Sequence, residues 1–264
     1  MRFLRKYSYY LYSIIELLTG FKNPVLILRI FLGGKTEIAR TVHLRSNGLA
    51  FRVRGAMDVW SIKETFLDRF YERCGFTIQP GWTVIDVGAG LGDFSLSAAQ
   101  TSDTHVLALE PFPESFELLA HNVTLNNSGN VTHLPEAVGS EEGMLLLDLA
   151  GGEPLQFQSR IAPVTHPESQ IAVKARSLSD IIQQTGQGKC DLIKLDCEGA
   201  EYDILMKSSR DTLVKIKRIV MEYHDNVTDY SHKDLADFLV EQGYKVQVFT
   251  NPVHEDLGYL RAER

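Results

Sequence analysis

The chain has 264 residues, of which 44% are hydrophobic, so it can form one large globular domain, with or without an appendage, and is not a disordered protein. Its 27 lysines and arginines and 34 aspartates and glutamates give a net charge of −7, which favours small-molecule or glycan substrates and argues against a nucleic-acid partner. The three cysteines, Cys74, Cys190 and Cys197, fit neither a zinc site nor a disulfide framework, so we expect a cytoplasmic protein.

Residues 1–35 are predicted to form an amphipathic helical N-terminal segment, followed by a main domain at residues 36–264. Apolar residues recur at helical spacing from Leu4 to Leu18, and a second apolar run over residues 25–32 stops at Gly33. Residues 1–33 carry five basic residues against Glu16 alone, a local charge of +4. Such helices either make a peripheral contact with an anionic membrane or, more commonly, pack on the main domain or in a homodimer. The segment is too polar to span a bilayer, and no secretory cleavage site follows it.

The rest of the chain predicts an α/β fold. Strand material over residues 42–53 surrounds a turn at residues 46–48, and residues 58–71 predict a helix. The strands then expected lie near residues 83–87, 105–109, 131–135, 190–196, 216–222 and 244–249, and the helices near 92–100, 113–126, 178–185, 200–208 and 231–242. This alternation predicts a mostly parallel sheet with helices on both faces. Residues 143–176 interrupt it with a β-hairpin insertion around residues 151–152, which either covers a site or only elaborates the surface.

A glycine loop at the end of the first strand of this alternation is the most informative feature. The strand ends in Asp86 and continues into Gly88, Ala89, Gly90 and Gly92. Glycines there allow the backbone to approach a ligand and to make a tight strand-to-helix turn. The spacing differs from the Gly-x-Gly-x-x-Gly of dinucleotide-binding loops, and Asp86 would repel a pyrophosphate but attract a sulfonium. We therefore expect S-adenosyl-L-methionine as the cofactor, with an NAD-dependent dehydrogenase of similar fold as the alternative.

The ends of the next two strands carry further candidate cofactor-binding residues. Glu110 ends the second strand, 18 residues beyond the last glycine of the loop, and precedes Pro111 and Phe112. A carboxylate about 20 residues after such a loop can accept both ribose hydroxyls, although a surface glutamate in a turn is the alternative. Phe112 could pack on an adenine ring. Glu136 and the backbone amide of Ala137 follow the third strand and could meet the adenine edge, because this strand end borders the same crevice.

Candidate catalytic residues follow two later strands. Asp196 and Glu198 come directly after an apolar strand, where two carboxylates can position a hydroxyl nucleophile or accept its proton. Helix capping is the structural alternative, and Glu201 fits it well. Glu222 and His224 lie on one face of the next strand end, and the ordinary pKa of a histidine suits a base near neutral pH. Asp196, Glu222 and His224 could instead hold a divalent cation, but no spacing demands it and we predict no metal site.

The chain resembles the FkbM-type S-adenosylmethionine-dependent methyltransferases. The resemblance covers roughly residues 50–250 and rests on the glycine loop, on Glu110-Pro111, and above all on residues 193–201 with residues 222–224. It implies a class I methyltransferase (Rossmann-like) fold and O-methylation of a hydroxyl on a sugar, a glycolipid or a natural product. Residues 1–35 lie outside it.

The leading hypothesis is therefore a methyltransferase in which an acceptor hydroxyl attacks the donor methyl group. Asp86 and the glycine loop would hold the methionine part of the donor, and Asp196, Glu198 and His224 would hold the acceptor. From a different class, the chain could be a catalytically silent relative that binds a glycan or a protein partner. A nucleic-acid amine methyltransferase is disfavoured, because no Pro-Pro-aromatic sequence follows the strand that ends at Asp196.

Overall fold

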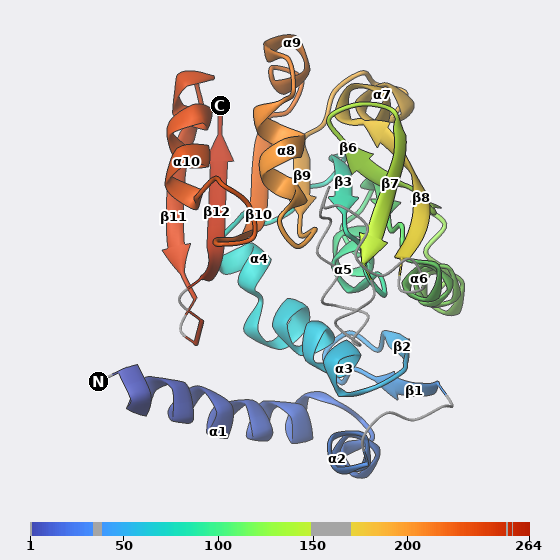
Figure 1. Cartoon of the computed structure of the whole chain (residues 1–264). Coiled ribbons are helices and arrows are strands. Elements are labelled where there is room, and N and C mark those ends of the chain that lie inside the picture. The colour runs from blue at the N-terminus through green and yellow to red at the C-terminus, as the bar shows by residue number, and fades with distance from the viewer. Residues whose placement is uncertain (1, 34–38, 149–169, 252, 255) are drawn as a thin grey trace.

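A seven-stranded sheet forms the centre of the computed structural model, which describes residues 2–33, 39–148, 170–251, 253–254 and 256–264 (Figure 1). The strands lie in the order β11 (Lys245–Thr250), β12 (Leu257–Glu263), β10 (Arg218–His224), β9 (Leu192–Leu195), β3 (Thr83–Val87), β4 (His105–Leu109) and β5 (Val131–Leu134). Neighbouring strands are parallel except that β12 runs antiparallel to β10 and β11. This confirms the predicted mostly parallel sheet and its six strands; β12 was not predicted.

Helices cover both faces of the sheet, as predicted. Successive residues of a strand point to opposite faces, so Val84 and Ile85 of β3 belong to two different hydrophobic clusters. The first cluster includes residues of α5 (Asp93–Ala99) and α6 (Pro113–Leu125), and the second includes residues of α7 (Leu178–Gln184), α8 (Ala200–Met206), α9 (Arg210–Leu213) and α10 (His232–Glu241). Both faces of β3 are therefore buried, which fits a sequence that is apolar except for Thr83 and Asp86.

The N-terminal part of the chain forms a layer at one end of the molecule (Figure 1). It contains α1 (Arg2–Gly20), α2 (Pro24–Leu32) and the antiparallel strands β1 (Arg40–His43) and β2 (Ala50–Val53). Phe21, Ile27 and Ile30 are buried in the same cluster as β1, β2 and the first face of the sheet. In the described part of the chain, no helix combines the length and the apolar character needed to cross a membrane.

The single helix predicted over residues 58–71 is replaced by three shorter elements. These are α3 (Ala56–Lys63), the π-helical turn η1 (Glu64–Asp68) and α4 (Phe70–Arg73). Arg69 separates the last two with a φ of 57°, in the left-handed region, and this backbone conformation ends a right-handed helix. The break turns α4 toward the carboxyl ends of the strands.

The insertion forms a small sheet of its own. Its strands lie in the order β6 (Ala137–Gly139), β8 (Gln170–Ser177) and β7 (Gly143–Asp148). β7 and β8 pair in antiparallel fashion, and the predicted turn at residues 151–152 lies outside the described residues. Leu147 and Val173 of this sheet are buried against Phe112, which follows β4. The insertion therefore packs over the carboxyl end of β4.

Candidate functional site

A pocket with an empty volume of about 1110 Å³, open mouth included, lies at the carboxyl ends of β3, β4 and β9. This is the edge of a parallel sheet at which ligands bind in α/β proteins. Gly88, Ala89 and Gly90 form one part of its wall, and Asp196 and Glu198 form another.

The glycine loop lies against the loop that follows β9. A Cβ atom on Gly88 would stand 1.9 Å from the carbonyl oxygen of Asp196, so only glycine fits there. Gly90 also has a positive φ, of 55°, but a Cβ atom on it would meet no atom within 4 Å, because it faces the pocket. Gly92 is not part of the pocket wall; it precedes α5 and faces Leu119. Two of the three predicted glycines therefore line the pocket.

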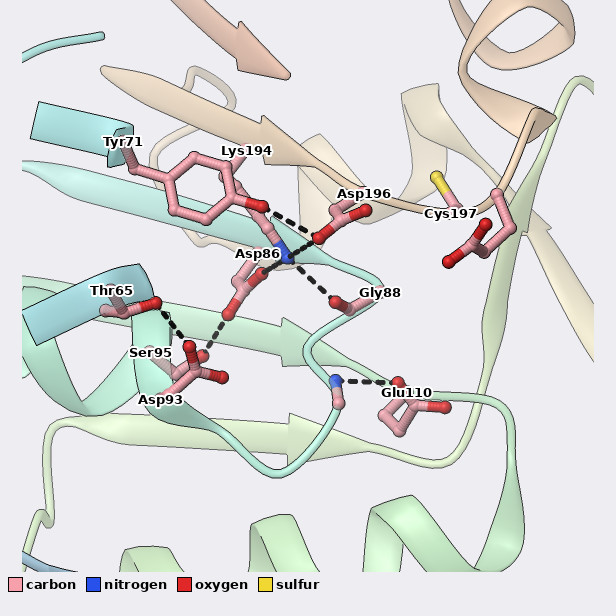
Figure 2. A network of polar contacts seen from close by, with 12 residues as sticks. Thr65, Tyr71, Asp86, Gly88, Asp93, Ser95, Glu110, Lys194, Asp196 and Cys197 are labelled. Atoms are coloured by element: carbon pink, nitrogen blue, oxygen red, sulfur yellow. Dashed lines mark hydrogen bonds and ion pairs between the residues drawn. The ribbon is translucent and has the colours of Figure 1, made fainter. Parts of the chain in front are cut away.

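Asp86 lies beneath the glycine loop and is not part of the pocket wall. Its fully buried carboxylate accepts a hydrogen bond of 2.6 Å from Ser95 Oγ and lies 3.1 Å from Lys194 Nζ. Lys194 Nζ also donates to the carbonyl oxygen of Gly88 at 2.8 Å and lies 3.8 Å from Asp196 (Figure 2). Burial lowers the pKa of Lys194, but the charges of Asp86 and Asp196 outweigh it and raise that pKa above its ordinary value. Asp86 thus anchors a buried ammonium group under the loop.

Lys194 had no assigned role at the sequence level. It stands opposite Asp86 in the parallel pairing of β3 with β9. A lysine inside an otherwise apolar strand was the available signal, because a buried ammonium needs a carboxylate partner. The identity of that partner depended on strand order.

Glu110 is held at the end of β4 by two backbone amides. Its carboxylate accepts a hydrogen bond of 2.7 Å from Gly90 and one of 2.9 Å from Phe112, and the residue lines the pocket. Each carboxylate oxygen keeps a second lone pair for a further donor. Burial raises the pKa of Glu110 to about 7, although the two amides act in the opposite direction. Pro111 and Phe112 continue this wall.

Glu136 and Ala137 form a neighbouring wall with the insertion. Glu136 is paired with Lys174 at 2.9 Å and with Arg176 at 3.5 Å, both on β8. Ala137 begins β6 and lines the pocket, as do Leu145 and Leu147 of β7. The insertion therefore contributes an apolar part of the pocket wall, which supports the covering role over mere surface elaboration.

The opposite part of the pocket is rich in carboxyl groups. Asp196 accepts a hydrogen bond of 2.7 Å from the Tyr71 hydroxyl, and Glu64, Glu198 and Glu222 line the same region. Burial raises the pKa of Glu64 and of Glu198 to about 7. Burial and the charge of Asp196 also raise the pKa of Glu222 well above its ordinary value. Glu64 and Glu198 therefore exchange protons near neutral pH, as general acids and bases must.

The backbone of Glu198 is strained. Its φ is 53°, a left-handed conformation that is uncommon for a residue with a side chain. Such conformations persist where the surrounding structure enforces them, and they cluster at functional sites. Here the turn directs the Glu198 side chain between the pocket and His224.

His224 stands behind the pocket wall and outside its lining. Its Nε2 lies 3.4 Å from Glu198 and its Nδ1 3.4 Å from Glu201. Burial would lower the pKa of His224, but Glu201 and Glu198 raise it to about 10. This direction favours a charged imidazole that supports Glu198, while the role of base expected of His224 stays a prediction.

Glu201 fulfils its expected capping role. Its carboxylate oxygens accept hydrogen bonds from the backbone amides of Cys197 at 2.6 Å and Gly199 at 2.8 Å. Asp196, Glu201 and His224 bring possible metal-ligating atoms within 4.8 Å of one another. Each oxygen of Glu201 already accepts one backbone hydrogen bond, and the expectation of no metal site stays a prediction.

Tyr71, Tyr259 and Glu64 complete the pocket wall and had no predicted role in chemistry. Tyr71 belongs to α4 and Glu64 to η1, elements that precede the sheet in the chain. No local sequence signal marks Tyr71 as part of a site formed with Asp196, 125 positions later.

Comparison with known proteins identifies similar chains. Residues 86–246 match the family model described as the methyltransferase FkbM domain. The 31-O-demethyl-FK506 methyltransferase FkbM of Streptomyces tacrolimicus is 24% identical over 245 residues, covering 83% of this chain and 94% of that protein. The hexuronic acid methyltransferase AglP of Haloferax volcanii is 23% identical over 199 residues, covering 75% and 78%. A solved structure of a methyltransferase FkbM from Methylobacillus flagellatus has a TM-score of 0.48 at 16% identity, covering 78% of this chain and 54% of that one.

Proposed function

Because this chain belongs to the FkbM methyltransferase family, with the class I methyltransferase fold, we propose that it is an S-adenosylmethionine-dependent O-methyltransferase. The observation that carries the proposal is the single pocket wall that joins the glycine loop and Glu110 to Asp196 and Glu198. The acceptor is a hydroxyl of a sugar, a glycolipid or a natural product. Relatives named for methylating demethyl-FK506 and a hexuronic acid support this class of acceptor.

The residues present fit the donor. Gly90 leaves open space at the loop, and Glu110 keeps free lone pairs beside it for the ribose hydroxyls. Phe112 and the leucines of β7 offer an apolar wall for the adenine ring. When bound, S-adenosylmethionine supplies a methyl group made electrophilic by its sulfonium. Asp86 supports the donor site indirectly. It fixes the ammonium group of Lys194, and Lys194 donates a hydrogen bond to the Gly88 carbonyl oxygen.

Glu198 is the proposed base. With a pKa of about 7 it is ionised in a large fraction of molecules at neutral pH, and its carboxylate accepts the proton that the acceptor hydroxyl loses. Cationic His224, 3.4 Å away, favours the ionised form of Glu198 and fixes its position. Asp196, held by Tyr71, orients the acceptor by accepting a hydrogen bond from it.

The charges in the pocket favour a neutral acceptor rich in hydroxyl groups. Four carboxyl groups, those of Glu64, Asp196, Glu198 and Glu222, face one ammonium group, and Asp86 already pairs with that ammonium. An acidic acceptor would add a further negative charge to this buried cluster. Tyr71 and Tyr259 provide aromatic surface for a sugar ring. We therefore propose a neutral glycoside in place of the hexuronic acid named for AglP.

Methyl transfer from labelled S-adenosylmethionine to a panel of neutral glycosides and hexuronic acids tests this function. The expected result is labelled methyl ether on neutral members of the panel, identified by mass spectrometry. Methylation of the hexuronic acids alone would contradict the proposed acceptor charge. Donor binding without transfer to any hydroxyl compound, including those of a fractionated cell extract, would favour a silent binding protein, and NAD binding would favour a dehydrogenase.

Replacing Glu110 by alanine is expected to weaken binding of S-adenosylmethionine and of its demethylated product by about 1–3 kcal/mol, because the ribose hydroxyls lose a charged acceptor. Isothermal titration calorimetry measures the change. Glu114→Ala is the matched control, since this exposed glutamate lies only four residues later and pairs with Arg54 at 3.5 Å, outside the pocket. Equal donor affinity in Glu110→Ala and the control would show that Glu110 does not bind the ribose.

A further inference from the structure

Helices α1 and α2 expose many large apolar side chains, which are here together called the outer face. Its side chains recur at helical spacing and have exposed fractions between 38% for Leu18 and 78% for Leu32. A monomeric soluble domain seldom leaves so many large apolar groups together in water. The members of the outer face are Tyr7, Leu11, Ile14, Ile15, Leu18, Val25, Leu28, Phe31 and Leu32.

The opposite side of α1 packs against the main domain, so the outer face is fixed in its orientation. Ser13 and Leu17 are buried, and the Tyr9 hydroxyl donates to Asp68 of η1 at 2.8 Å. Glu16 also points inward, where it lies 3.3 Å from the fully buried ammonium group of Lys63. The main domain therefore covers one side of α1 and leaves the apolar outer face uncovered.

The charges around the outer face are positive. Lys6, Lys22 and Arg29 are exposed beside it, whereas Glu16, the only acidic residue among residues 1–33, is turned away. The chain as a whole has a net charge of −7, so this basic surface stands apart from an acidic protein. Apolar side chains bordered by lysine and arginine are the pattern of helices that lie on anionic membranes.

Self-association fits this pattern less well. A twofold dimer through the outer face would place the same surface of both copies together, and with it the same positive charges. An anionic bilayer instead supplies the opposite charge together with an apolar interior.

The inward side of α1, opposite the outer face, is close to the pocket. Trp60 of α3 packs against Tyr9 and Tyr10 of α1, with ring centroids 6.1 Å and 6.0 Å apart. Trp60 Nε1 donates to Glu64 at 2.9 Å, and Glu64 lines the pocket. One layer of side chains from α3 and η1 thus separates α1 from the carboxyl-rich part of the pocket.

We infer that the outer face docks the protein on an anionic lipid bilayer and that the acceptor is a lipid-linked sugar in the same membrane. The second part rests on the proposed O-methyltransferase function; the first does not. Docking would hold the pocket close to the bilayer, with α1 and one layer of side chains from α3 and η1 in between.

Sedimentation of the full chain with vesicles tests the docking. Binding is expected to vesicles that contain phosphatidylglycerol and not to those of phosphatidylcholine alone, and it weakens as salt screens the charges. Leu11→Glu with Ile15→Glu should reduce vesicle binding by ~10-fold or more, because both carboxylates would enter the apolar layer. Val240→Glu, an exposed valine of α10, is the matched control and should leave binding unchanged.

Donor affinity and methylation of a water-soluble glycoside should be the same in the double variant and the wild type, while methylation of a vesicle-borne glycolipid falls. Vesicle binding that the double variant retains would overturn the docking. A stable dimer that the same substitutions dissociate would also overturn it, by assigning the outer face to a protein interface. If no hydroxyl acceptor is methylated in solution or in vesicles, the proposed function fails while the docking result stands.

Discussion

Replacing Lys194 by methionine is expected to lower the free energy of unfolding by about 3–5 kcal/mol, the typical cost of breaking a buried ion pair on one side. Asp86 is fully buried, and Lys194 is the only cation that the described residues place in contact with its carboxylate. The Gly88 carbonyl would lose its hydrogen bond at the same time. Urea denaturation followed by circular dichroism measures the change.

Two further variants make this expectation specific. Lys207→Met removes an exposed lysine that pairs with Asp203 at 2.8 Å, and it should change stability by less than about 1 kcal/mol. Asp86→Asn combined with Lys194→Met should lose less stability than Lys194→Met alone, because no unpaired charge then remains buried. If the double variant loses as much stability as Asp86→Asn and Lys194→Met lose in total, the ion pair is not the source of the stability loss in Lys194→Met.

Replacing Glu198 by glutamine is expected to reduce kcat by about 100-fold or more, the usual contribution of a positioned general base. Donor affinity should change little, since the glycine loop and Glu110 remain. In the wild type, kcat should rise as pH increases through about 7, because only the ionised carboxylate of Glu198 accepts a proton. This rise should be absent in Glu198→Gln. A wild-type rate in the variant would assign proton removal to solvent or to another group. Glu241→Gln replaces an exposed glutamate and is the control, which should leave kcat unchanged.

The same pH profile tests the supporting role of His224. The positive charge of His224 lowers the pKa of Glu198 relative to burial alone. His224→Gln should therefore move the midpoint of the profile to higher pH and leave the rate at high pH closer to that of the wild type. A loss of rate at every pH with an unchanged midpoint would contradict this role.

The fold was predictable where local pattern determines structure. The apolar runs of β3 and β4, each buried on both faces, are recognisable without any knowledge of their neighbours. β12 was missed because it includes a glycine and charged residues, and the reason for the glycine lies in another strand. A Cβ atom on Gly258 would stand 2.4 Å from the Tyr223 hydroxyl oxygen. Likewise, nothing in the local sequence marks Arg69 for a left-handed turn.

The position of a site residue was predictable where it follows directly from the end of one strand. Glu110 and Asp196 were expected at such ends, and both line the pocket. Contacts between distant segments were not predictable. The hydroxyl of Tyr71 binds a carboxylate 125 residues later, and the partner of Asp86 depends on which strand lies beside β3. The surroundings of His224 were hidden for the same reason, because Glu201 and Glu198, which raise its pKa, meet it only in the folded chain.

The backbone contact between Gly88 and Asp196 limits how this enzyme can diversify. At this point the loop on the donor side and the loop on the acceptor side touch main chain to main chain, so side-chain substitutions cannot alter their separation. New acceptors must be accommodated by the peripheral walls, which come from η1, α4 and the β7–β8 insertion. Over evolutionary time, the centre of the pocket is therefore expected to stay constant while its rim changes with the substrate.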